Sequence, residues 1–335
     1  MRLNNFLYCL LLLVIASITI TSCSGCGNKN KEYASNLSKV ICDESFKNIL
    51  DEEIEVFEYQ YKDKNVSVLP LYLDESSALD SLLEGKVNVI ITYRDLTLNQ
   101  KRILKGQNRA FRSKRIAVDA IALIANKDND IDYLSMNDIK DILTGKSTKW
   151  GQVYPTKMKD NPIHVVFDRN GSGVVHYMKD KFNNGEDFPI EYYAQGSSQA
   201  VFDLVEKDKN AIGVIGVSWI ADDMKSTVQP IEERYADLEK GGTVEGTSFT
   251  DKIKVLGVRK EDVIKDYKPY QQHIYDGNYP LTREIFAIDA SGLGTTDHNF
   301  FVFITSNIGQ KIILQTGISP AGVPVRIVNV GGNEE

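Results

Sequence analysis

Residues 164–182 read HVVFDRNGSGVVHYMKDKF, and this stretch contains the pattern that decides the fold. The run from Pro162 to Phe167 is apolar and rich in branched residues, which is typical of a buried strand. The glycine-bearing turn DRNGSG follows at residues 168–173. From Val174 to Phe182 the apolar side chains recur at helical spacing. The sequence therefore predicts a strand, a tight turn and a helix in direct succession.

A turn of this kind can bind an anion. Unpaired backbone N–H groups at the start of a helix, together with the helix dipole, favour negative charge. Gly171 and Gly173 let a ligand approach the backbone closely. Ser172 can cap the helix or donate its hydroxyl, and Arg169 adds a planar cation suited to oxyanions. Taken alone, the turn fits a helix cap with a surface arginine better than a binding site. The choice between these two interpretations therefore depends on the rest of the chain.

Length and composition describe an ordinary soluble protein of about two domains. The chain has 335 residues, of which 42% are hydrophobic and 25% charged, as in globular proteins generally. The net charge is −7. No basic run with interleaved aromatic residues occurs, so we expect no nucleic-acid partner. An anion site in this acidic chain must act locally, through backbone dipoles and a nearby arginine.

The N-terminal segment predicts a lipoprotein. The apolar run from Phe6 to Ile20 is shorter than the roughly 20 residues that a membrane-spanning helix needs, and it fits a signal peptide. Small residues precede Cys23 as in a bacterial lipobox, whereas Cys26 lacks the usual aliphatic residue. We expect a signal peptide at 1–22, lipidation at Cys23, a polar tether at 23–36, and a protein anchored by lipid in the cell envelope.

The sequence shows no catalytic machinery. Cys42 stands alone in the folded part, so neither a disulfide framework nor a CxxC metal pair is present. The four histidines are scattered without zinc-ligand spacing. No G-x-S-x-G elbow occurs, and Val174 stands where a phosphate-loop NTPase has lysine. We therefore expect no enzyme activity, no catalytic residue, no metal and no cofactor.

The first third of the folded chain predicts alternating strands and helices. Apolar strands at 39–42, 66–72 and 87–92 are separated by amphipathic helices at 46–57 and 74–84. This βαβαβ order favours a mostly parallel sheet covered by helices. Ligands bind such sheets beyond the carboxyl ends of the strands. The turns at residues 44–45, 75–76 and 93–94 fall there.

The rest of the folded chain predicts further strands and a helix. The strand 115–126, RIAVDAIALIAN, contains Asp119 and is long enough to cross between lobes. Residues 211–217 predict a buried strand, 279–288 an extended apolar segment, and 299–314 one helix. Residues 224–250 are polar, and we expect an irregular surface excursion there.

Six segments in a shared order resemble a known family. They are VDAIALIAN (118–126), LSMNDIKDILTGKSTKW (134–150), PIHVVFDRNGSGV (162–174), AIGVIGV (211–217), YPLTREIFAI (279–288) and FFVFITSNIGQKIILQTGISPAGVP (300–324). The chain resembles the phosphate-type (Pst-like) periplasmic solute-binding proteins of bacterial ABC transporters, in the lipoprotein form of Bacteroidetes-like bacteria. The resemblance implies an α/β, type II periplasmic binding protein fold: two lobes with mostly parallel sheets, joined by two crossover strands and closing on the ligand. Lobe one would be 36–120 plus 278–330, and lobe two 121–277.

The resemblance also implies ligand-binding residues. Arg169, Gly171, Ser172 and Gly173 match the family's R-x-G-S-G-T turn, in which arginine and serine hold the oxyanion, although Val174 replaces the threonine. Ser45 stands near the family's first ligand turn. Ser76 and Ser77 stand near its second.

A third ligand turn would lie at Tyr93 and Arg94. Family members that select phosphate over sulfate commonly place there an aspartate that accepts the proton of hydrogen phosphate. Tyr93 stands at that place, so we expect weaker rejection of sulfate. The roles of Asp95, Glu44 and Glu75 stay open.

Together these observations predict a monomeric, lipid-anchored solute-binding protein that captures an oxyanion, with phosphate as the first candidate, and delivers it to ABC permease subunits. The alternative is a lipoprotein of the same fold that serves as a sensory or scaffold component, or binds another small anion.

Overall fold

The structure is a computed structural model. It describes residues 36–222, 230–240 and 252–322. The predicted signal peptide at 1–22 and the lipidation site Cys23 lie outside these residues, and so does all of the tether except Asn36.

Lobe one contains a parallel sheet built around β1. Strand β1 pairs with β2 on one side and β3 on the other, both in parallel. The strands and their connecting helices are β1 (Leu37–Cys42), α3 (Lys47–Gln60), β2 (Ser67–Tyr72), α4 (Glu75–Leu83), β3 (Val89–Thr92) and α5 (Leu98–Gly106). The predicted βαβαβ order is therefore confirmed. It places the turns after β1, β2 and β3 at the same edge of the sheet.

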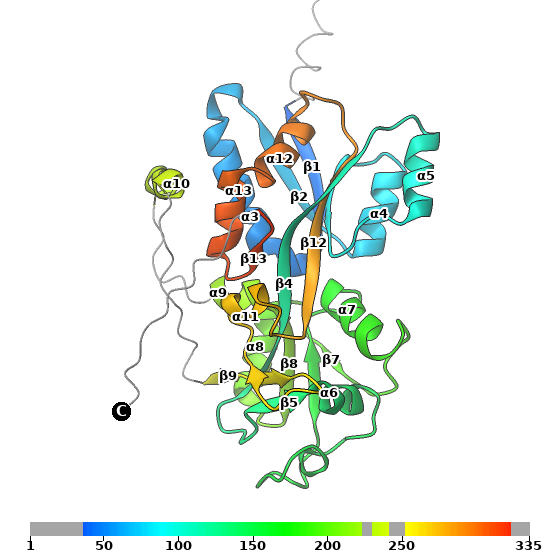
Figure 1. The fold of residues 1–335 in the computed structure, drawn as a ribbon, viewed down its shortest axis with the longest axis vertical. Coiled ribbons are helices and arrows are strands. Elements are labelled where there is room, and N and C mark those ends of the chain that lie inside the picture. The colour runs from blue at the N-terminus through cyan, green and yellow to red at the C-terminus, as the bar shows by residue number, and fades with distance from the viewer. Residues whose placement is uncertain (1–35, 223–229, 241–251, 323–335) are drawn as a thin grey trace, which may run out of the picture.

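Two long strands connect lobe one to lobe two. Strands β4 (Arg112–Asn126) and β12 (Thr282–Asp289) run antiparallel beside each other, and Figure 1 shows them passing from the upper to the lower part of the molecule. β12 also pairs with β3, while the far end of β4 pairs with β8. One continuous ladder of strands thus joins the two lobes.

Lobe two repeats the arrangement of lobe one. Strand β6 lies between β8 and β7 and is parallel to both. The elements are β5 (Tyr133–Ser135), α6 (Met136–Leu143), β6 (His164–Phe167), α7 (Gly173–Phe182), β7 (Tyr193–Ala194), α8 (Ser198–Lys207) and β8 (Ala211–Gly216). The strand, turn and helix predicted at residues 162–182 are confirmed.

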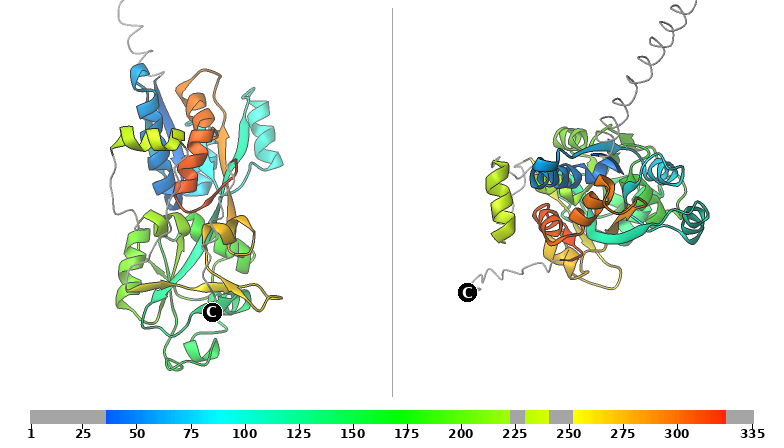
Figure 2. Two further views of the ribbon diagram at one scale, coloured as in Figure 1. Left: turned by 60° about the vertical axis from the view of Figure 1, so that its left-hand side comes forward. Right: turned by 90° about the horizontal axis from the view of Figure 1, so that it is seen from above.

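Short elements complete the two lobes, which Figure 2 shows stacked along the long axis. They are η1 (Glu44–Phe46), η2 (Lys62–Lys64), η3 (Trp150–Gln152), α9 (Val217–Asp222), α10 (Ile231–Lys240), β9 (Ile253–Val255), β10 (Gly257–Arg259), β11 (Asp266–Tyr267), α11 (Gln271–Tyr275), α12 (Thr296–Ile304), α13 (Asn307–Gln315) and β13 (Ser319–Pro320).

Two sequence predictions are wrong. The helix expected at 299–314 is two helices, α12 and α13, because the Ser306 side chain caps a new helix by accepting from Gly309 N at 3.4 Å. The excursion expected at 224–250 contains helix α10. Its Leu238 is buried, and the helix packs against α3 and α13.

None of the helices in the described part of the chain has the length and apolar character required to span a membrane.

Candidate functional site

A buried ion pair lies where the two long strands cross between the lobes. Arg283 of β12 and Asp119 of β4 are direct partners in the antiparallel register, so their side chains project from the same face of the ribbon. Arg283 donates to Asp119 Oδ2 from Nε at 3.0 Å and from Nη2 at 2.8 Å. The side chains are 1% and 0% exposed. The guanidinium carbon lies over the Phe46 ring, 4.3 Å from the ring centroid, which adds a cation–π contact.

The turn after β1 brings two more polar side chains to this pair. Ser45 Oγ accepts a hydrogen bond from Arg283 Nη2 at 2.8 Å. Ser45 in turn donates to Asp43 Oδ1, from its hydroxyl at 2.6 Å and from its backbone N–H at 2.9 Å. Asp43 therefore caps the short helix η1, and both residues are buried. Ser45 thus lies beside a buried cation, and its role in binding a ligand stays a prediction.

The start of α7 approaches the same place from lobe two. Gly173 N donates to Asp43 Oδ2 at 2.8 Å. A methyl group added at Gly173 would lie 3.1 Å from Asp43 Cγ and 3.2 Å from Arg283 Nη1. Only glycine lets the backbone come this close. The structure therefore brings the predicted residues Ser45 and Gly173 together, around an arginine that was not predicted.

Ser172 acts as a helix cap in this structure. Its hydroxyl donates to Asp168 Oδ1 at 2.5 Å and accepts from Val175 N at 3.2 Å. The oxygen of Ser172 and the carboxylate of Asp168 are both buried. The role of Ser172 in holding an oxyanion stays a prediction.

Three buried polar atoms near the ion pair have no hydrogen-bond partner among the described residues. They are Nη1 of Arg283, Oδ1 of Asp119 and the hydroxyl of Tyr177. Buried polar groups are normally paired, because an unpaired one costs roughly 1–3 kcal/mol. Burial raises the pKa of the Tyr177 hydroxyl, so it is a neutral group able to donate or accept. One cation, one acceptor and one hydroxyl are therefore available to a ligand.

Burial also changes the nearby carboxyl groups. It raises the pKa of Asp119, although the Arg283 charge opposes the rise. It likewise raises the pKa of Asp168, against the hydrogen bond from Ser172. Two carboxyl groups that interact with the Arg283 charge, those of Asp119 and Asp168, thus take up a proton more readily than exposed ones.

Arg169 lies at the rim of this site. Its Nη2 atom is 2.8 Å from Oε2 of Glu44, and 35% of its side chain is exposed. Arg169 belongs to lobe two and Glu44 to lobe one, so the pair joins the lobes. Gly171 is exposed nearby, and a methyl group there would lie 4.0 Å from Asp74 Cβ. The ligand roles proposed for Arg169 and Gly171 from the sequence stay predictions.

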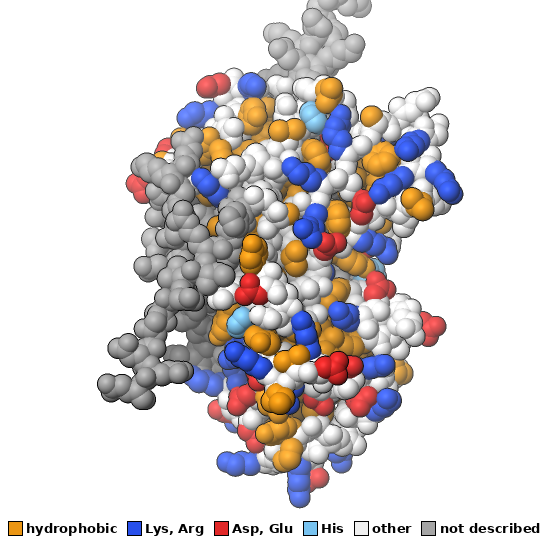
Figure 3. All heavy atoms as spheres, viewed as in Figure 1, with side chains coloured by type: hydrophobic (Ala, Val, Ile, Leu, Met, Phe, Trp, Pro, Cys, Tyr) orange, Lys and Arg blue, Asp and Glu red, His pale blue; other side chains and the backbone are white. Residues whose placement is uncertain are grey.

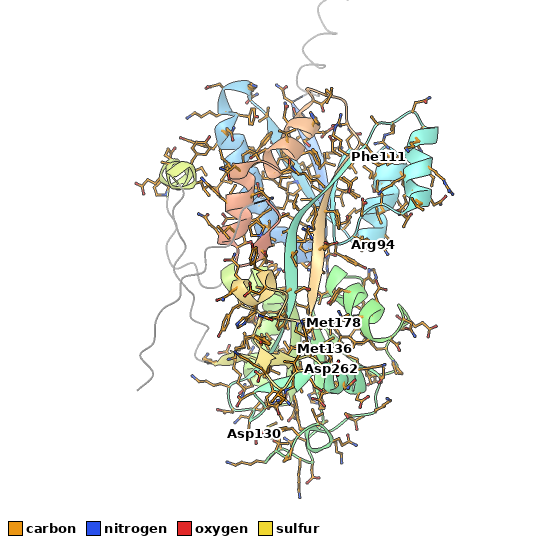
Figure 4. All side chains as sticks on the ribbon, viewed as in Figure 1. Arg94, Phe111, Asp130, Met136, Met178 and Asp262 are labelled. Carbon is orange, nitrogen blue, oxygen red and sulfur yellow. The ribbon has the colours of Figure 1, made fainter. Side chains whose placement is uncertain are left out.

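Tyr93 and Arg94 follow β3 and lie on the lobe-one side of the cleft. Figure 4 shows Arg94 at the level where the lobes meet, and Figure 3 shows the outline of the molecule indented there. Arg94 Nε is 3.0 Å from Oε2 of the buried Glu75. Tyr93 donates to Asp180 of α7 at 3.4 Å. Burial raises the pKa of Glu75 to about 7, and the Arg94 charge opposes the rise.

The remaining predicted residues lie in lobe one, and the partners of Ser77 and Asp95 are local. Ser77 donates to Asp74 from its hydroxyl at 2.6 Å and from its backbone N–H at 2.9 Å, while Ser76 is exposed. Asp95 pairs with Lys101 at 2.6 Å and accepts from Ser113 at 2.5 Å. These partners all belong to lobe one or to the β4 end that adjoins it. Among the described residues, no group of three or more His, Cys, Asp or Glu side chains is placed to hold a metal ion.

Three residues at the centre of this site, Arg283, Asp119 and Asp43, were not predicted from the sequence to have a binding role. The sequence signal that could have revealed Arg283 is the alternation of buried and exposed residues along its segment. Arg283 and Ile285 occupy buried positions of β12, Thr282 and Glu284 the more exposed ones, and the buried Leu281 directly precedes the strand. A charge in the buried phase of a strand indicates either a paired or a functional residue.

The fold and the site together define a two-lobed ligand-binding protein. The chain matches the PBP superfamily domain over residues 31–307, and it belongs to this family.

The chain is also similar to individual proteins whose binding function is described. The phosphate-binding protein PstS of Staphylococcus aureus (strain USA300) is 23% identical over 211 residues, which are 63% of this chain and 55% of that protein. The chain thus matches about half the length of these relatives.

Two solved structures share the fold. One is a candidate phosphate ABC transporter substrate-binding protein from Clostridium perfringens, with bound phosphate: TM-score 0.62, 23% identity, 85% of this chain and 100% of that chain. The other is an ABC-type phosphate transport receptor from Vibrio cholerae: TM-score 0.60, 19% identity, 84% of this chain and 99% of that chain. The expected type II periplasmic binding protein fold is confirmed.

The buried pair of Arg283 and Asp119 should contribute far more to the free energy of unfolding than an exposed ion pair on the same two strands. We expect Asp119→Ala to lower the free energy of unfolding by about 3–5 kcal/mol, because it leaves Arg283 charged and unpaired in the interior. Glu284→Ala is the matched control: Glu284 pairs with Arg115 at 2.7 Å on the same two strands, but about half of each side chain is exposed. That variant should lose less than about 1 kcal/mol. Urea unfolding measures both, and equal losses would contradict the assignment.

The raised pKa of Glu75 predicts a pH-dependent stability. A rise from 4.5 to about 7 corresponds to roughly 3 kcal/mol. Because the pKa of the folded state is the higher one, this stability is present below pH 4.5 and is lost as the pH rises through 7. Relative to Glu75→Gln, the free energy of unfolding of the wild type should fall by up to this amount between pH 4 and pH 8. Parallel pH profiles would show that Glu75 ionises normally.

Proposed function

We propose that this protein is a solute-binding protein of an ABC transporter that captures an oxyanion, phosphate first, in the cleft between its lobes. Lobe one comprises residues 36–120 and 278–330, and lobe two residues 121–277. The protein binds and delivers its ligand and is not an enzyme. The relatives described as phosphate-binding and transport proteins support this proposal.

The observation that carries the proposal is the Nη1 atom of Arg283, which lies beside the start of α7 and has no hydrogen-bond partner in the described part of the chain. An arginine donor and a backbone N–H at a helix N-terminus are two groups that oxyanions prefer. Both are buried, so their interactions with an anion are screened less than at the surface. Ser45 and Tyr177 add hydroxyl groups around the same place.

The carboxyl groups near Arg283 favour phosphate over sulfate. A carboxylate oxygen such as Asp119 Oδ1 can accept a hydrogen bond, and hydrogen phosphate offers a proton at neutral pH. Sulfate has no proton to offer, so its charge would face these carboxylates unpaired. With these acceptors we expect clear rejection of sulfate, whereas Tyr93 alone predicts a weaker rejection.

We also propose where the protein lies in the cell envelope and with which proteins it works. Lipidation at Cys23 would anchor the protein to a membrane on the periplasmic side, with the tether 23–36 between lipid and domain. ABC permease subunits would receive the ligand, and the protein would act as a monomer. The signal-like segment before Cys23 supports this part.

The test is calorimetric titration with phosphate and sulfate at neutral pH. We expect Arg283→Lys to weaken phosphate binding about 10- to 150-fold, because it loses a charge-assisted hydrogen bond but keeps the charge that pairs with Asp119. Arg115→Lys, on the exposed face of the same pair of strands, should bind like the wild type. Thermal unfolding of each variant confirms that it is folded.

Two results would contradict the proposal. If the wild type binds neither anion, the phosphate function fails and only the fold assignment stands. If Arg169→Ala abolishes phosphate binding while Arg283→Lys does not change it, the ligand binds at the rim rather than at the buried arginine.

A further inference from the structure

Asp43 holds the position that an anionic ligand needs. Its Oδ2 atom accepts the hydrogen bond from Gly173 N at 2.8 Å, and this amide lies at the first residue of the ten-residue helix α7. A carboxylate and a phosphate compete for the same kind of donor, because both are oxyanions attracted by the positive end of the helix dipole.

The Asp43 carboxylate and the buried Arg283 guanidinium both lie close to the start of α7. A methyl group at Gly173 would meet both Asp43 Cγ, at 3.1 Å, and Arg283 Nη1, at 3.2 Å. Nη1 is buried and has no hydrogen-bond partner among the described residues. An anion that binds Nη1 and the α7 amide together must therefore enter the space in which the Asp43 carboxylate lies.

The same bond joins the lobes, since Asp43 follows β1 of lobe one and Gly173 begins α7 of lobe two. Its neighbours reinforce the contact. Glu44 pairs with Arg169 at 2.8 Å, and Ser218 Oγ donates to the Ser45 backbone oxygen at 3.2 Å. The turn of residues 43–45 thus contacts two separate segments of lobe two, the 169–173 turn and Ser218, and it also contacts the crossover strand β12.

We propose that Asp43 is an internal competitor of the ligand. Its carboxylate binds the amide at the start of α7 and holds the lobes together, and the anion binds by displacing it. Asp43 thereby sets the affinity, because each binding event has to replace an existing charged hydrogen bond. The competition with phosphate rests on the proposed function, whereas the contact between the lobes does not.

The chain offers a matched control. Asp74 caps α4 as Asp43 caps η1: it accepts from Ser77 N at 2.9 Å and from Ser77 Oγ at 2.6 Å, the same distances as for Asp43 and Ser45. Within the described part of the chain, its hydrogen bonds go to Ser77 of lobe one and not to lobe two. Asp43→Asn and Asp74→Asn therefore remove the same charge from the same kind of cap.

Asparagine at position 43 tests the proposal without removing the cap. An amide has a single acceptor oxygen. That oxygen can accept from Ser45 N and keep η1 capped, but the amide NH₂ then faces Gly173 N–H, and two donors do not pair. The variant therefore loses the bond between the lobes and should keep its local fold, which circular dichroism verifies.

The experiment measures phosphate affinity by calorimetry and the radius of gyration by X-ray scattering, on the full chain, with and without inorganic phosphate. We expect Asp43→Asn to bind phosphate about tenfold or more tightly than the wild type. Without phosphate it should have a larger radius of gyration, which phosphate reduces. Asp74→Asn should resemble the wild type in both measurements.

Equal or weaker phosphate binding by Asp43→Asn would overturn the competition, and weaker binding would make Asp43 an acceptor that contacts the ligand. An unchanged radius of gyration without phosphate would overturn its role between the lobes. If no variant binds phosphate, the proposed function fails, and the radius of Asp43→Asn still decides whether Asp43 holds the lobes together.

Discussion

The ion pair between Arg283 and Asp119 is the constraint on which the site depends. Burying a guanidinium is costly unless its charge and its donors are paired. Asp119 supplies the pairing because the β4–β12 register places it directly opposite. Two donors go to Asp119, one of them shared with Ser45, and Nη1 is left over. The pair thus holds a cation at the crossing of the lobes, and one of its donor atoms is unused by the residues that the structure describes.

The remaining elements bring polar groups to that donor from both lobes. The turn after β1 contributes Asp43 and Ser45, and the turn after β6 contributes the amide of Gly173. Both turns stand at the carboxyl ends of parallel strands, where such folds bind ligands. The protein is acidic overall, so attraction of an anion has to come from this short-range arrangement and not from net charge.

Much of the fold could be predicted from the sequence, because strands and helices follow local patterns. The strand–turn–helix at 164–182 and the long strand with Asp119 are examples. The break between α12 and α13 was missed because the apolar spacing continues through Ser306, whose capping role depends on local backbone geometry. Arg283 was missed because its pairing depends on a register between strands far apart in the chain, and Asp43 because its bond to Gly173 joins two lobes. Arg169 stood out in the sequence, yet nothing local indicates that Glu44 lies beside it.

The most direct measurement is a crystal structure of the protein grown with arsenate, whose anomalous scattering marks the position of the anion. We expect the arsenic in the cleft, with one oxygen bound to Arg283 Nη1 and another to Gly173 N in place of the Asp43 carboxylate. Arsenate held by Arg169 at the rim, with the bond between Asp43 and Gly173 intact, would contradict a site built on the buried arginine.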